Sequence, residues 1–425
     1  MSQALPKTYS KGKAVAWALY DWANSGFPTV VSTFVIAAYF TQGIAHDPVA
    51  GQSQWGWMQT LAAFAIALLS PLLGAIADQG RRRRAMLTLC TLITAIFTAL
   101  IWFARPDPAD ALYALICIGI ATIAFELGTV FYNAMLPGLV PEERMGRLSG
   151  LAWGLGYAGG LACLLLALVL FIQPDPSPFG LDRGAAEHVR ASAVLVAVWI
   201  LVFSWPVLIA LPDPKGVRPR LRDALAAGLH EMGTLLRGLP RRPAMARFLI
   251  ARLFYTDGLN TLFAFGAIYA AGVHGMTIQE ILYFGIAMNV TAGLGAAGFG
   301  LIEDRLGAKP TVMIALGAMI VLGSFLLLSN DKTMFWILAM ALGLFMGPAQ
   351  AASRTLMARM APPDEVTAHF GLFALSGRAT GFLGPAAVAM VTAMSGSQAW
   401  GLATVIAFLA LGAAILAPLR VVRHS

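Results

Sequence analysis

Six ionisable side chains lie well inside apolar stretches of the sequence, where a charge is costly. They are three carboxylates and three guanidinium groups: Asp21, Glu126, Asp257, Arg252, Arg354 and Arg378. A charge at the centre of a bilayer costs roughly 2.5–3.5 kcal/mol even on a lenient insertion scale, so such groups should face a cavity or one another. Acids and bases in equal number could bind a charged solute, exchange protons, or form ion pairs that lock helices together.

Asp21 starts a polar face on its predicted helix. Asn24 and Ser25 follow at i+3 and i+4, which places the three side chains on one side of a helix. Pro28, at i+7, removes a backbone hydrogen bond and predicts a kink. The same residue types recur at the same spacing later in the chain, as Asp257, Asn260 and Thr261. For both aspartates, gating or helix locking is as reasonable a role as contact with a solute.

Glu126 and Arg378 are the candidates for direct contact with a solute. Each should lie about 16 Å from the basic end of its helix, and Asp21 about 12 Å, so the three could share one central cavity. Glu126 could titrate a proton or bind a cationic group, or it could belong to an ion pair that only locks helices. Arg378 could anchor a carboxylate. Tyr132 and Asn133, which follow Glu126 on the same predicted helix, are further candidates. Arg252 and Arg354 lie nearer the basic ends of their helices, and we expect them in structural or gating pairs.

A short loop carries a second kind of signal, in the spacing of Gly74, Asp78 and Gly80 before a run of arginines that begins at Arg81. Glycine permits close helix approach, and Asp78 could accept hydrogen bonds from the N-terminus of a neighbouring helix. The arginines could clamp a carboxylate in one conformation only, which would make the loop a gating latch. A plain basic anchor would explain the arginines but not the spacing.

Other chemistry finds no support in the sequence. There is no Walker phosphate loop and no His-Glu-x-x-His, and the six histidines have no paired spacing, so neither a metal nor a cofactor is expected. The net charge of +8 could suggest a nucleic-acid partner in a soluble protein. In a membrane protein it instead reflects basic loops on one side, so the expected partners are the bilayer and a small solute.

The elements that must hold these residues are transmembrane helices. The chain of 425 residues is 58% hydrophobic and 12% charged, which excludes an ordinary soluble fold. The sequence predicts an all-α membrane protein with twelve spans: 14–40, 56–77, 86–104, 111–136, 149–172, 191–211, 246–272, 279–301, 310–329, 333–358, 368–393 and 398–418.

Most of the 29 Lys and Arg residues lie in the termini and the even-numbered loops, which predicts that both termini are cytoplasmic. The longest connection, 212–245, is basic and divides an N-terminal six-helix bundle, 1–211, from a C-terminal one, 246–425. Its leucines, Leu229 among them, recur at helical spacing and predict an amphipathic helix on the membrane surface. A regulatory or partner-binding segment is the alternative.

The two halves repeat short patterns in the same order. The aspartate faces match, Gly74 to Gly80 is echoed by a later stretch containing Asp304, and the fifth and eleventh spans share their glycine spacing. Two parallel six-helix halves with a solute site between them are typical of major facilitator transporters. We expect this protein to act as a monomer.

The sequence resembles one branch of that superfamily. Residues 20–27 are similar to the opening signature of the branch related to the autophagy-associated vacuolar amino-acid effluxer, and 131–137, 254–261 and 353–359 resemble further blocks. Arg378 stands where the resemblance leads us to expect Lys. The resemblance implies export of amino acids.

We therefore expect a secondary transporter in a bacterial inner membrane that works by alternating access. The hypothesis is a zwitterionic solute with its carboxylate on Arg378 and its amino group near Glu126, with proton coupling through Glu126 or Asp21. Export of sugars or drugs is the alternative within this class. The alternatives from other classes are a polytopic membrane enzyme and a sensor. The sequence contains no catalytic constellation that would support an enzyme.

Overall fold

The structure is a computed structural model that describes residues 10–211, 213 and 221–419. The described residues are almost entirely helical and contain no strand. The first half contains α1 (Lys11–Asn24), η1 (Phe27–Phe34), α2 (Ile36–Tyr39), η2 (Phe40–Ile44), α3 (Pro48–Gly80), α4 (Arg83–Leu100), η3 (Ile101–Phe103), α5 (Ala111–Asn133), α6 (Met145–Ala167), η7 (Leu168–Ile172) and α7 (Glu187–Ala210). The second contains α8 (Leu221–Gly238), α9 (Pro243–His274), α10 (Ile278–Leu306), α11 (Ala308–Leu328), α12 (Lys332–Met360), α13 (Val366–Arg378), α14 (Leu383–Ser395) and α15 (Gln398–Leu416).

The helices agree with the predicted spans in order and place, and most of their ends lie within a few residues of the prediction; α3 begins eight residues earlier, at Pro48. Among the described residues, ten helical segments are long and apolar enough to cross a membrane by length and composition. The other two predicted spans correspond to α9 and to the α13–α14 pair. The all-helical membrane fold expected from the sequence is therefore confirmed.

The eleventh span differs from the prediction, which made 368–393 continuous. It breaks into α13 and α14, with a turn at 379–382 between them. Pro385 explains the position of the break, because it has no N–H to bond the carbonyl of Gly381, and proline fits the first turn of a helix. The turn leaves Arg378 at one end of the break and Gly384 at the other.

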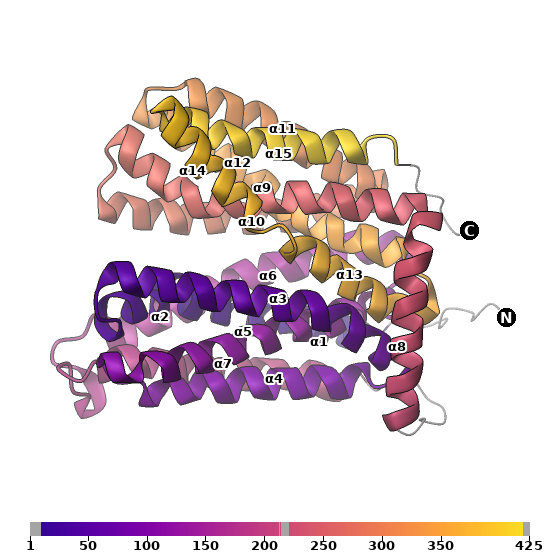
Figure 1. The fold of residues 1–425 in the computed structure, drawn as a ribbon, viewed down its shortest axis with the longest axis horizontal. Coiled ribbons are helices and arrows are strands. Elements are labelled where there is room, and N and C mark those ends of the chain that lie inside the picture. The colour runs from indigo at the N-terminus through magenta and orange to yellow at the C-terminus, as the bar shows by residue number, and fades with distance from the viewer. Residues whose placement is uncertain (1–9, 212, 214–220, 420–425) are drawn as a thin grey trace.

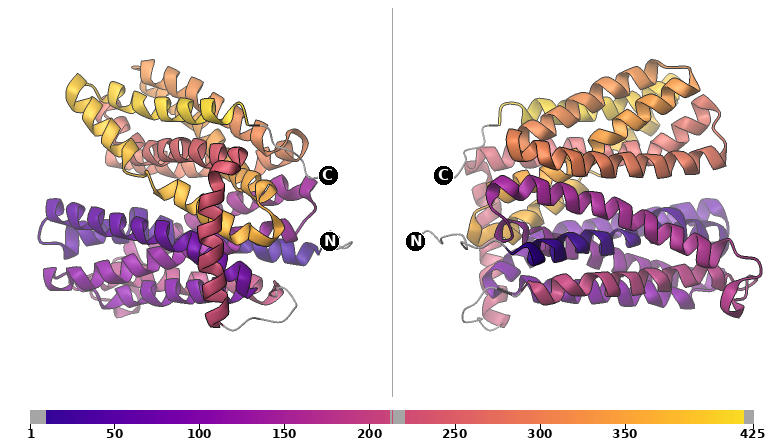
Figure 2. Two further views of the ribbon diagram at one scale, coloured as in Figure 1. Left: turned by 45° about the vertical axis from the view of Figure 1, so that its right-hand side comes forward. Right: turned by 180° about the vertical axis from the view of Figure 1, so that it is seen from behind.

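The helices form two bundles that lie side by side (Figures 1 and 2). α1–α7 make one bundle and α9–α12, α14 and α15 the other, with α13 reaching across to contact α3. The other main contact between the bundles is that of α6 with α10. A Cβ on Gly150 of α6 would lie 2.9 Å from Cα of Gly300 on α10, so only glycine allows this approach.

One helix, α8, lies across the ends of both bundles, and we call this end of the molecule the α8 end (Figures 1 and 2). It packs on α3, where a Cβ on Gly228 would lie 2.9 Å from Cα of Ile76. Gln79 donates a hydrogen bond of 2.8 Å to Glu231 of α8. Leu229, predicted to belong to the apolar face, is 58% exposed, because the face that contacts α3 contains small residues.

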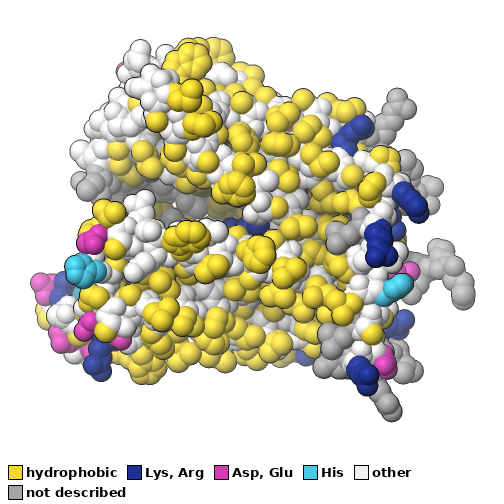
Figure 3. Space-filling view, viewed as in Figure 1, with side chains coloured by type: hydrophobic (Ala, Val, Ile, Leu, Met, Phe, Trp, Pro, Cys, Tyr) yellow, Lys and Arg dark blue, Asp and Glu magenta, His cyan; other side chains and the backbone are white. Residues whose placement is uncertain are grey.

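Large apolar side chains cover much of the outer surface, and charged groups gather toward the two ends (Figure 3). Leu68, Phe325 and Leu328 are among the exposed ones. A soluble protein would bury such side chains, whereas a bilayer solvates them. The surface therefore agrees with the integral membrane protein predicted from the composition.

Candidate functional site

A cavity runs between the two bundles from the end opposite α8 toward the middle of the molecule. It consists of an outer void of about 750 Å³ and an inner void of about 270 Å³. The two voids share six lining residues: Ser25, Pro28, Trp153, Gly156, Asn260 and Gln350. The space-filling view shows the bundles separated by a hollow at the end away from α8 (Figure 3). A solute entering from that end would therefore reach the inner void.

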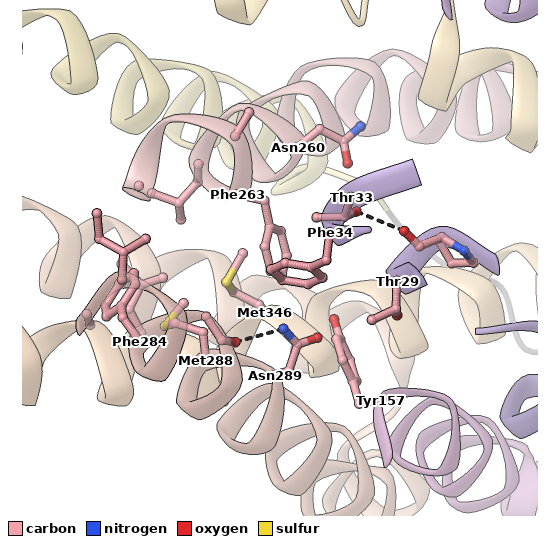
Figure 4. Close-up of a pocket in the computed structure, with 18 of the residues that line it drawn as sticks. Thr29, Thr33, Phe34, Tyr157, Asn260, Phe263, Phe284, Met288, Asn289 and Met346 are labelled. Carbon is pink, nitrogen blue, oxygen red and sulfur yellow. Dashed lines mark hydrogen bonds between the residues drawn. The ribbon is translucent and has the colours of Figure 1, made fainter. Parts of the chain in front are cut away.

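The first helix changes its winding where it lines the cavity. η1 is a π-helical stretch with Pro28 in its first turn, so the predicted irregularity is a run of wide turns. Thr29 donates a hydrogen bond of 2.8 Å to the carbonyl of Ser25, and Thr33 one of 2.9 Å to that of Pro28 (Figure 4). These hydroxyls bind their own backbone, which leaves the wall of the outer void less polar than its sequence suggests.

The outer void is lined mostly by apolar side chains, among them several aromatic residues and two methionines (Figure 4). Phe34 and Phe263 approach each other from opposite bundles. Asn289 donates a hydrogen bond of 2.8 Å to the carbonyl of Gly285 in its own helix. Lining residues that were not among the candidates from the sequence are Phe34, Tyr157, Phe263, Phe284, Met288, Asn289, Met346 and Gln350.

Two of these, the amides Asn289 and Gln350, carried a signal in the sequence. Gln350 is an amide inside an apolar span, and it donates a hydrogen bond of 3.4 Å to the hydroxyl of Tyr157 across the two bundles. An aromatic or methionine residue inside a span gives no such signal, because it suits packing against other helices equally well.

Glu126 and Arg378 form an ion pair in the inner void. Glu126 lies on α5 in the first bundle, and Arg378 is the last residue of α13, directly before the break. Their side chains are 18% and 40% exposed, so a solute in the cavity can reach both. The two residues predicted to hold opposite ends of a zwitterion are therefore close together and bind each other.

A second ion pair joins the bundles more deeply. Arg354 of α12 donates a hydrogen bond of 2.9 Å to Asp21 of α1, and its side chain is 3% exposed. It also donates to Ser149, at 2.9 Å to the hydroxyl and 2.8 Å to the carbonyl, and to Asn133 at 3.4 Å. One guanidinium thus bonds to three helices of the other bundle. The ammonium group of Lys could not replace it, because it lacks the planar array of N–H donors.

Aromatic rings surround this guanidinium. Its carbon lies 4.8 Å from the ring centroid of Trp17 and 5.7 Å from those of Tyr132 and Trp153. Tyr132 stacks on Trp17 with 4.4 Å between ring centroids and does not line either void. We therefore assign Tyr132 to the support of Arg354 and not to solute contact.

The remaining candidates on α9 divide between the cavity and the bundle interior. Arg252 faces the inner void, lies 3.4 Å above the ring of Phe373, and donates to the hydroxyl of Ser376 at 2.9 Å and to the carbonyl of Phe373. Asn260 lines both voids. Asp257 lines neither and instead accepts a hydrogen bond of 2.9 Å from the backbone N–H of Gly384 in α14.

The loop predicted as a latch lies at the α8 end, between the bundles. Asp78 accepts hydrogen bonds from the backbone N–H groups of Thr367 and Ala368 at 2.8 and 3.0 Å, at the N-terminus of α13, and from Arg83 at 2.7 Å. A Cβ on Gly74 would clash with the backbone of Thr367. Gly80 faces α8, and Arg81 ends α3 in a left-handed conformation with φ 50°.

Asp304 makes the matching contact in the other half. It accepts a hydrogen bond of 2.9 Å from the backbone N–H of Arg147, at the start of α6, and an ion pair at 3.4 Å from the Arg147 side chain. Asp78 lies near the end of α3 and caps the N-terminus of α13, and Asp304 lies near the end of α10 and caps the N-terminus of α6. The two repeats thus close the α8 end with equivalent contacts.

A third contact closes the same end outside the spans. Arg242 donates a hydrogen bond of 2.8 Å to Glu365, just before α13, and lies 3.2 Å from Nε2 of His369. The hydrogen bond from Arg242 lowers the pKa of Glu365 below its ordinary value.

The structure thus brings most of the candidates together at one place. The inner void is lined by Asp21, Asn24, Ser25, Glu126, Asn133, Arg252, Asn260, Arg354 and Arg378. The gating candidates Gly74, Asp78, Gly80, Arg81 and Asp304 lie at the α8 end. In the part of the chain that the structure describes, no group of three or more His, Cys, Asp or Glu could hold a metal ion.

The described cavity is open at one end and closed at the other. The contacts of Asp78, Asp304 and Arg354 between the bundles all lie on the α8 side of the inner void, whereas the outer void contains residues from the opposite ends of the helices, such as Ile281 and Phe335. This asymmetry is what one of two alternating conformations requires.

Comparisons with known proteins agree with this geometry. A family described as "Vacuole effluxer Atg22 like" matches residues 48–424. An uncharacterised MFS-type transporter of Bacillus subtilis, YxiO, is 25% identical over 405 residues, which cover 95% of this chain and 93% of YxiO. Autophagy-related protein 22 of Cryptococcus neoformans is 26% identical over 300 residues, 65% of this chain and 51% of that protein.

Solved structures show the same fold at low identity. The proton:xylose symporter XylE has a TM-score of 0.73 at 14% identity, with 96% of this chain and 95% of that chain covered. The human organic anion transporter MFSD10 has a TM-score of 0.71 at 18% identity, with 96% and 99% covered. The twelve-helix major facilitator architecture expected from the sequence is therefore confirmed.

Proposed function

Since this chain belongs to the Atg22-like vacuole effluxer family of major facilitator transporters, we propose that it carries an amino acid across a bacterial inner membrane by alternating access. Secondary transport of a small solute follows from the family itself. The finer points, which are the amino acid, the direction and the coupling to protons, are our proposal. We further propose that the protein acts as a monomer, with the α8 end in the cytoplasm.

The pair formed by Glu126 and Arg378 carries this proposal. An amino acid at neutral pH bears one carboxylate and one ammonium group, the same two charges as the pair. Such a solute could separate the pair and replace each partner, with its carboxylate on Arg378 and its ammonium on Glu126. The number of ion pairs would rise from one to two without leaving a charge unpaired in the cavity, which is the costly alternative.

The position of the pair supports a transport step as well as binding. Arg378 ends α13, and the N-terminus of the same helix is held by Asp78 at the α8 end. A solute that draws Arg378 away from Glu126 would therefore act on the helix that closes the α8 end. Binding and the opening of that end could then be linked through one rigid element.

Export and proton coupling have separate support. The name of the matching family, vacuole effluxer, supports export, and the resemblance of the motifs supports an amino acid as the solute. Asp21 and Glu126 are carboxylates that line the inner void, so either could exchange a proton with the cavity. We assign the coupling role in the solute site to Glu126, because Asp21 is held by the less exposed Arg354.

A second candidate is a larger organic solute such as a drug, with a sugar as a further one. The outer void, about 750 Å³ and lined by Phe34, Phe263, Phe284 and Met288, favours a solute with an apolar body. A thermal-shift screen over amino acids, sugars and amphipathic drugs separates the classes, because only binders of the native state raise the unfolding temperature.

Uptake of labelled amino acids into proteoliposomes, with and without a pH gradient, tests the function. We expect flux that the gradient increases, and Glu126→Gln should remove the increase. Flux that ignores the gradient and survives Glu126→Gln would contradict coupling through Glu126. Loss of flux on substitution of Arg378 or Glu126 would also exclude a membrane enzyme or a sensor, since neither moves solute.

A further inference from the structure

We propose that Asp257 is a proton-binding site, separate from the solute cavity, and that the break between α13 and α14 links it to the ion pair of Glu126 and Arg378. The proposal deepens the transport function proposed above and rests on it for its link to solute. The site consists of Asp257 and Thr261 on α9 and Gly384 in the first turn of α14.

Asp257 is a buried carboxyl with half of its hydrogen-bonding capacity unused. Its residue is 1% exposed. One oxygen, Oδ2, accepts the N–H of Gly384 at 2.9 Å, but Oδ1 has no hydrogen-bond partner among the described residues. Thr261, also 1% exposed, has a hydroxyl in the same condition. Buried polar atoms without partners are rare in native proteins and point to something that binds them.

Both unpartnered oxygens face one point. A Cβ built on Gly384 would lie 3.0 Å from Oδ1 of Asp257 and would clash with the hydroxyl oxygen of Thr261. Glycine at position 384 therefore lets the first turn of α14 lie against both oxygens. Any larger residue would push α14 away from α9, so the sequence keeps this small space available.

No cation neutralises Asp257 in the described part of the chain. Other carboxylates inside the membrane helices have guanidinium partners: Arg354 for Asp21, Arg378 for Glu126 and, at 4.0 Å, Arg359 for Glu303. Asp257 takes part in none of the ion pairs between described residues. A buried carboxylate without a counter-charge is too costly to persist, so a neutral, protonated carboxyl is the stable form.

The elements around Asp257 contribute few charges. α14 and α15, which pack against α9, contain no Asp, Glu, Lys, Arg or His. The other charged or titratable groups are Arg247, Arg252 and His274 on α9 itself and His369 and Arg378 on α13. α10 and α12 also contact α9; they carry Glu280, Glu303, Asp304, Arg305, Lys332, Arg354 and Arg359, none of which forms an ion pair with Asp257 among the described residues. Arg252 is held by Phe373 and Ser376 and Arg378 by Glu126, so neither neutralises Asp257.

A proton suits this site better than a metal cation. A sodium or calcium ion needs several oxygen ligands, whereas only two unpartnered side-chain oxygens are present here. In the proposed step, an O–H bond forms on Oδ1 of the carboxylate as one O–H bond of hydronium breaks, which gives the neutral acid and water; the reverse step returns the proton to water as hydronium. No other bond forms or breaks.

The break in the eleventh span connects this site with the solute. Arg378, on one side of the turn, contacts Glu126, and Gly384, on the other, contacts Asp257. A carboxylate accepts a hydrogen bond more strongly than a neutral acid, so proton binding weakens the contact of Asp257 with Gly384 and loosens α14. Proton loss would tighten it and so bias the position of Arg378.

Infrared titration of the full-length protein in lipid nanodiscs tests the proposal directly. As the pH is lowered we expect a carbonyl-stretch band of a protonated carboxyl to grow, and Asp257→Asn should lose it. Glu303, on α10, is also 1% exposed and also has an oxygen without a hydrogen-bond partner among the described residues, so it can contribute a band of its own. Glu303→Gln should remove only that contribution and keep the band of Asp257. Thr261→Val should shift that band, which keeps the test valid where Asp257→Asn fails to fold.

Two results would overturn the proton site. One is a wild-type spectrum identical to that of Asp257→Asn in the carboxyl region. The other is loss of the band on adding sodium chloride at fixed pH, with potassium chloride as control, which would assign the site to sodium. Absence of amino-acid flux would refute the proposed function alone and leave the band of Asp257 unaffected, so the two failures are distinguishable.

Discussion

At the residue scale, the charges inside the membrane divide into working and structural groups. Glu126 and Arg378 are accessible from the cavity, whereas Arg354 is enclosed and bonded to several groups at once. A pair that a solute must open has to be reachable, and a pair that holds a closed end has to be buried. The exposure of the guanidinium group therefore separates the two pairs, because the two carboxylates are equally exposed at 18%.

The enclosed pair predicts a specific coupling between mutations. Arg354→Gln should destabilise the protein by up to about 3 kcal/mol, because it leaves Asp21, whose side chain is 18% exposed at the inner void, without its partner. Asp21→Asn in the same chain should recover part of that loss. A double-mutant cycle measured by thermal unfolding in detergent checks this.

Additive losses in that cycle would contradict the assignment of the pair. Lys332→Gln is the matched control: Lys332 pairs with the exposed Glu280 at 2.6 Å outside the cavity, and exposed pairs contribute about 0–1 kcal/mol.

The sequence predicted which residues would matter at this scale but not how they pair. Charge in an apolar span is visible in one chain, so all six ionisable residues could be selected. The partner of Arg354 could not, because Asp21 is 333 positions away and only the packing of two bundles brings them together. Phe34 and Tyr157 carry no charge, so the sequence did not single them out.

At the scale of elements, α13 is the connection between the closed end and the cavity. Asp78 caps its first turn with two backbone hydrogen bonds, and Arg378 is its last residue. Thirteen residues of helix thus join the latch to the solute pair.

Removal of that cap should open the α8 end. Asp78→Ala should cost the closed form about 1–2 kcal/mol, the usual loss for an N-cap, and raise the labelling rate of a cysteine at Ser149 by roughly tenfold. The measurement is thiol labelling in membranes on a background without the three native cysteines.

Asp47 provides the control for this prediction. It caps α3 at the opposite end, with hydrogen bonds of 2.9 and 2.8 Å to Val49 and Ala50, without joining the bundles. Asp47→Ala should leave the labelling rate at Ser149 unchanged. An equal rise in both variants would show general loosening and contradict a latch.

The contact of Arg242 with Glu365 predicts a dependence on pH. Because the folded-state pKa of Glu365 is lowered, its stabilising effect is complete above the ordinary glutamate pKa and is lost as the pH falls through the lowered value. Thermal stability followed against pH should show this acidic loss, and Arg242→Gln should make it smaller. Curves of equal slope for the two proteins would refute the contact's role.

Sequence reasoning found the elements but not the break between α13 and α14. Apolar composition predicts that a segment crosses the membrane, and it is nearly uniform across 368–393. The signals for the break, Gly381 and Pro385, also occur in continuous membrane helices, where neighbours compensate for the lost hydrogen bond. Only the contact of Asp257 with Gly384 shows that the interruption has a use.

At the scale of the whole molecule, the two bundles meet through glycines and separate around the cavity. Gly150→Val should push α6 away from α10 by adding side-chain atoms where the backbone already makes contact, at a typical overpacking cost of about 1–3 kcal/mol. The conformation with the α8 end closed should then be less populated. Spin-label measurements should show this as shorter distances between the two bundles at the opposite end. Gly317→Val is the control, because a Cβ on Gly317 of α11 would meet open space, and it should leave these distances unchanged. Equal changes in the two variants would contradict the role of Gly150 in the contact between the bundles.

The measurement that tests the central claim most directly is solute counterflow in proteoliposomes with matched analogues. A labelled amino acid should exchange with unlabelled amino acid inside, and analogues without the amino group or without the carboxylate should compete at least roughly tenfold more weakly, since each lacks one charge-assisted contact. Glu126→Gln should lose discrimination against the analogue without the amino group, and Arg378→Gln against the one without the carboxylate. Exchange that tolerates both analogues equally, or that neither substitution alters, would contradict a zwitterion held between Glu126 and Arg378.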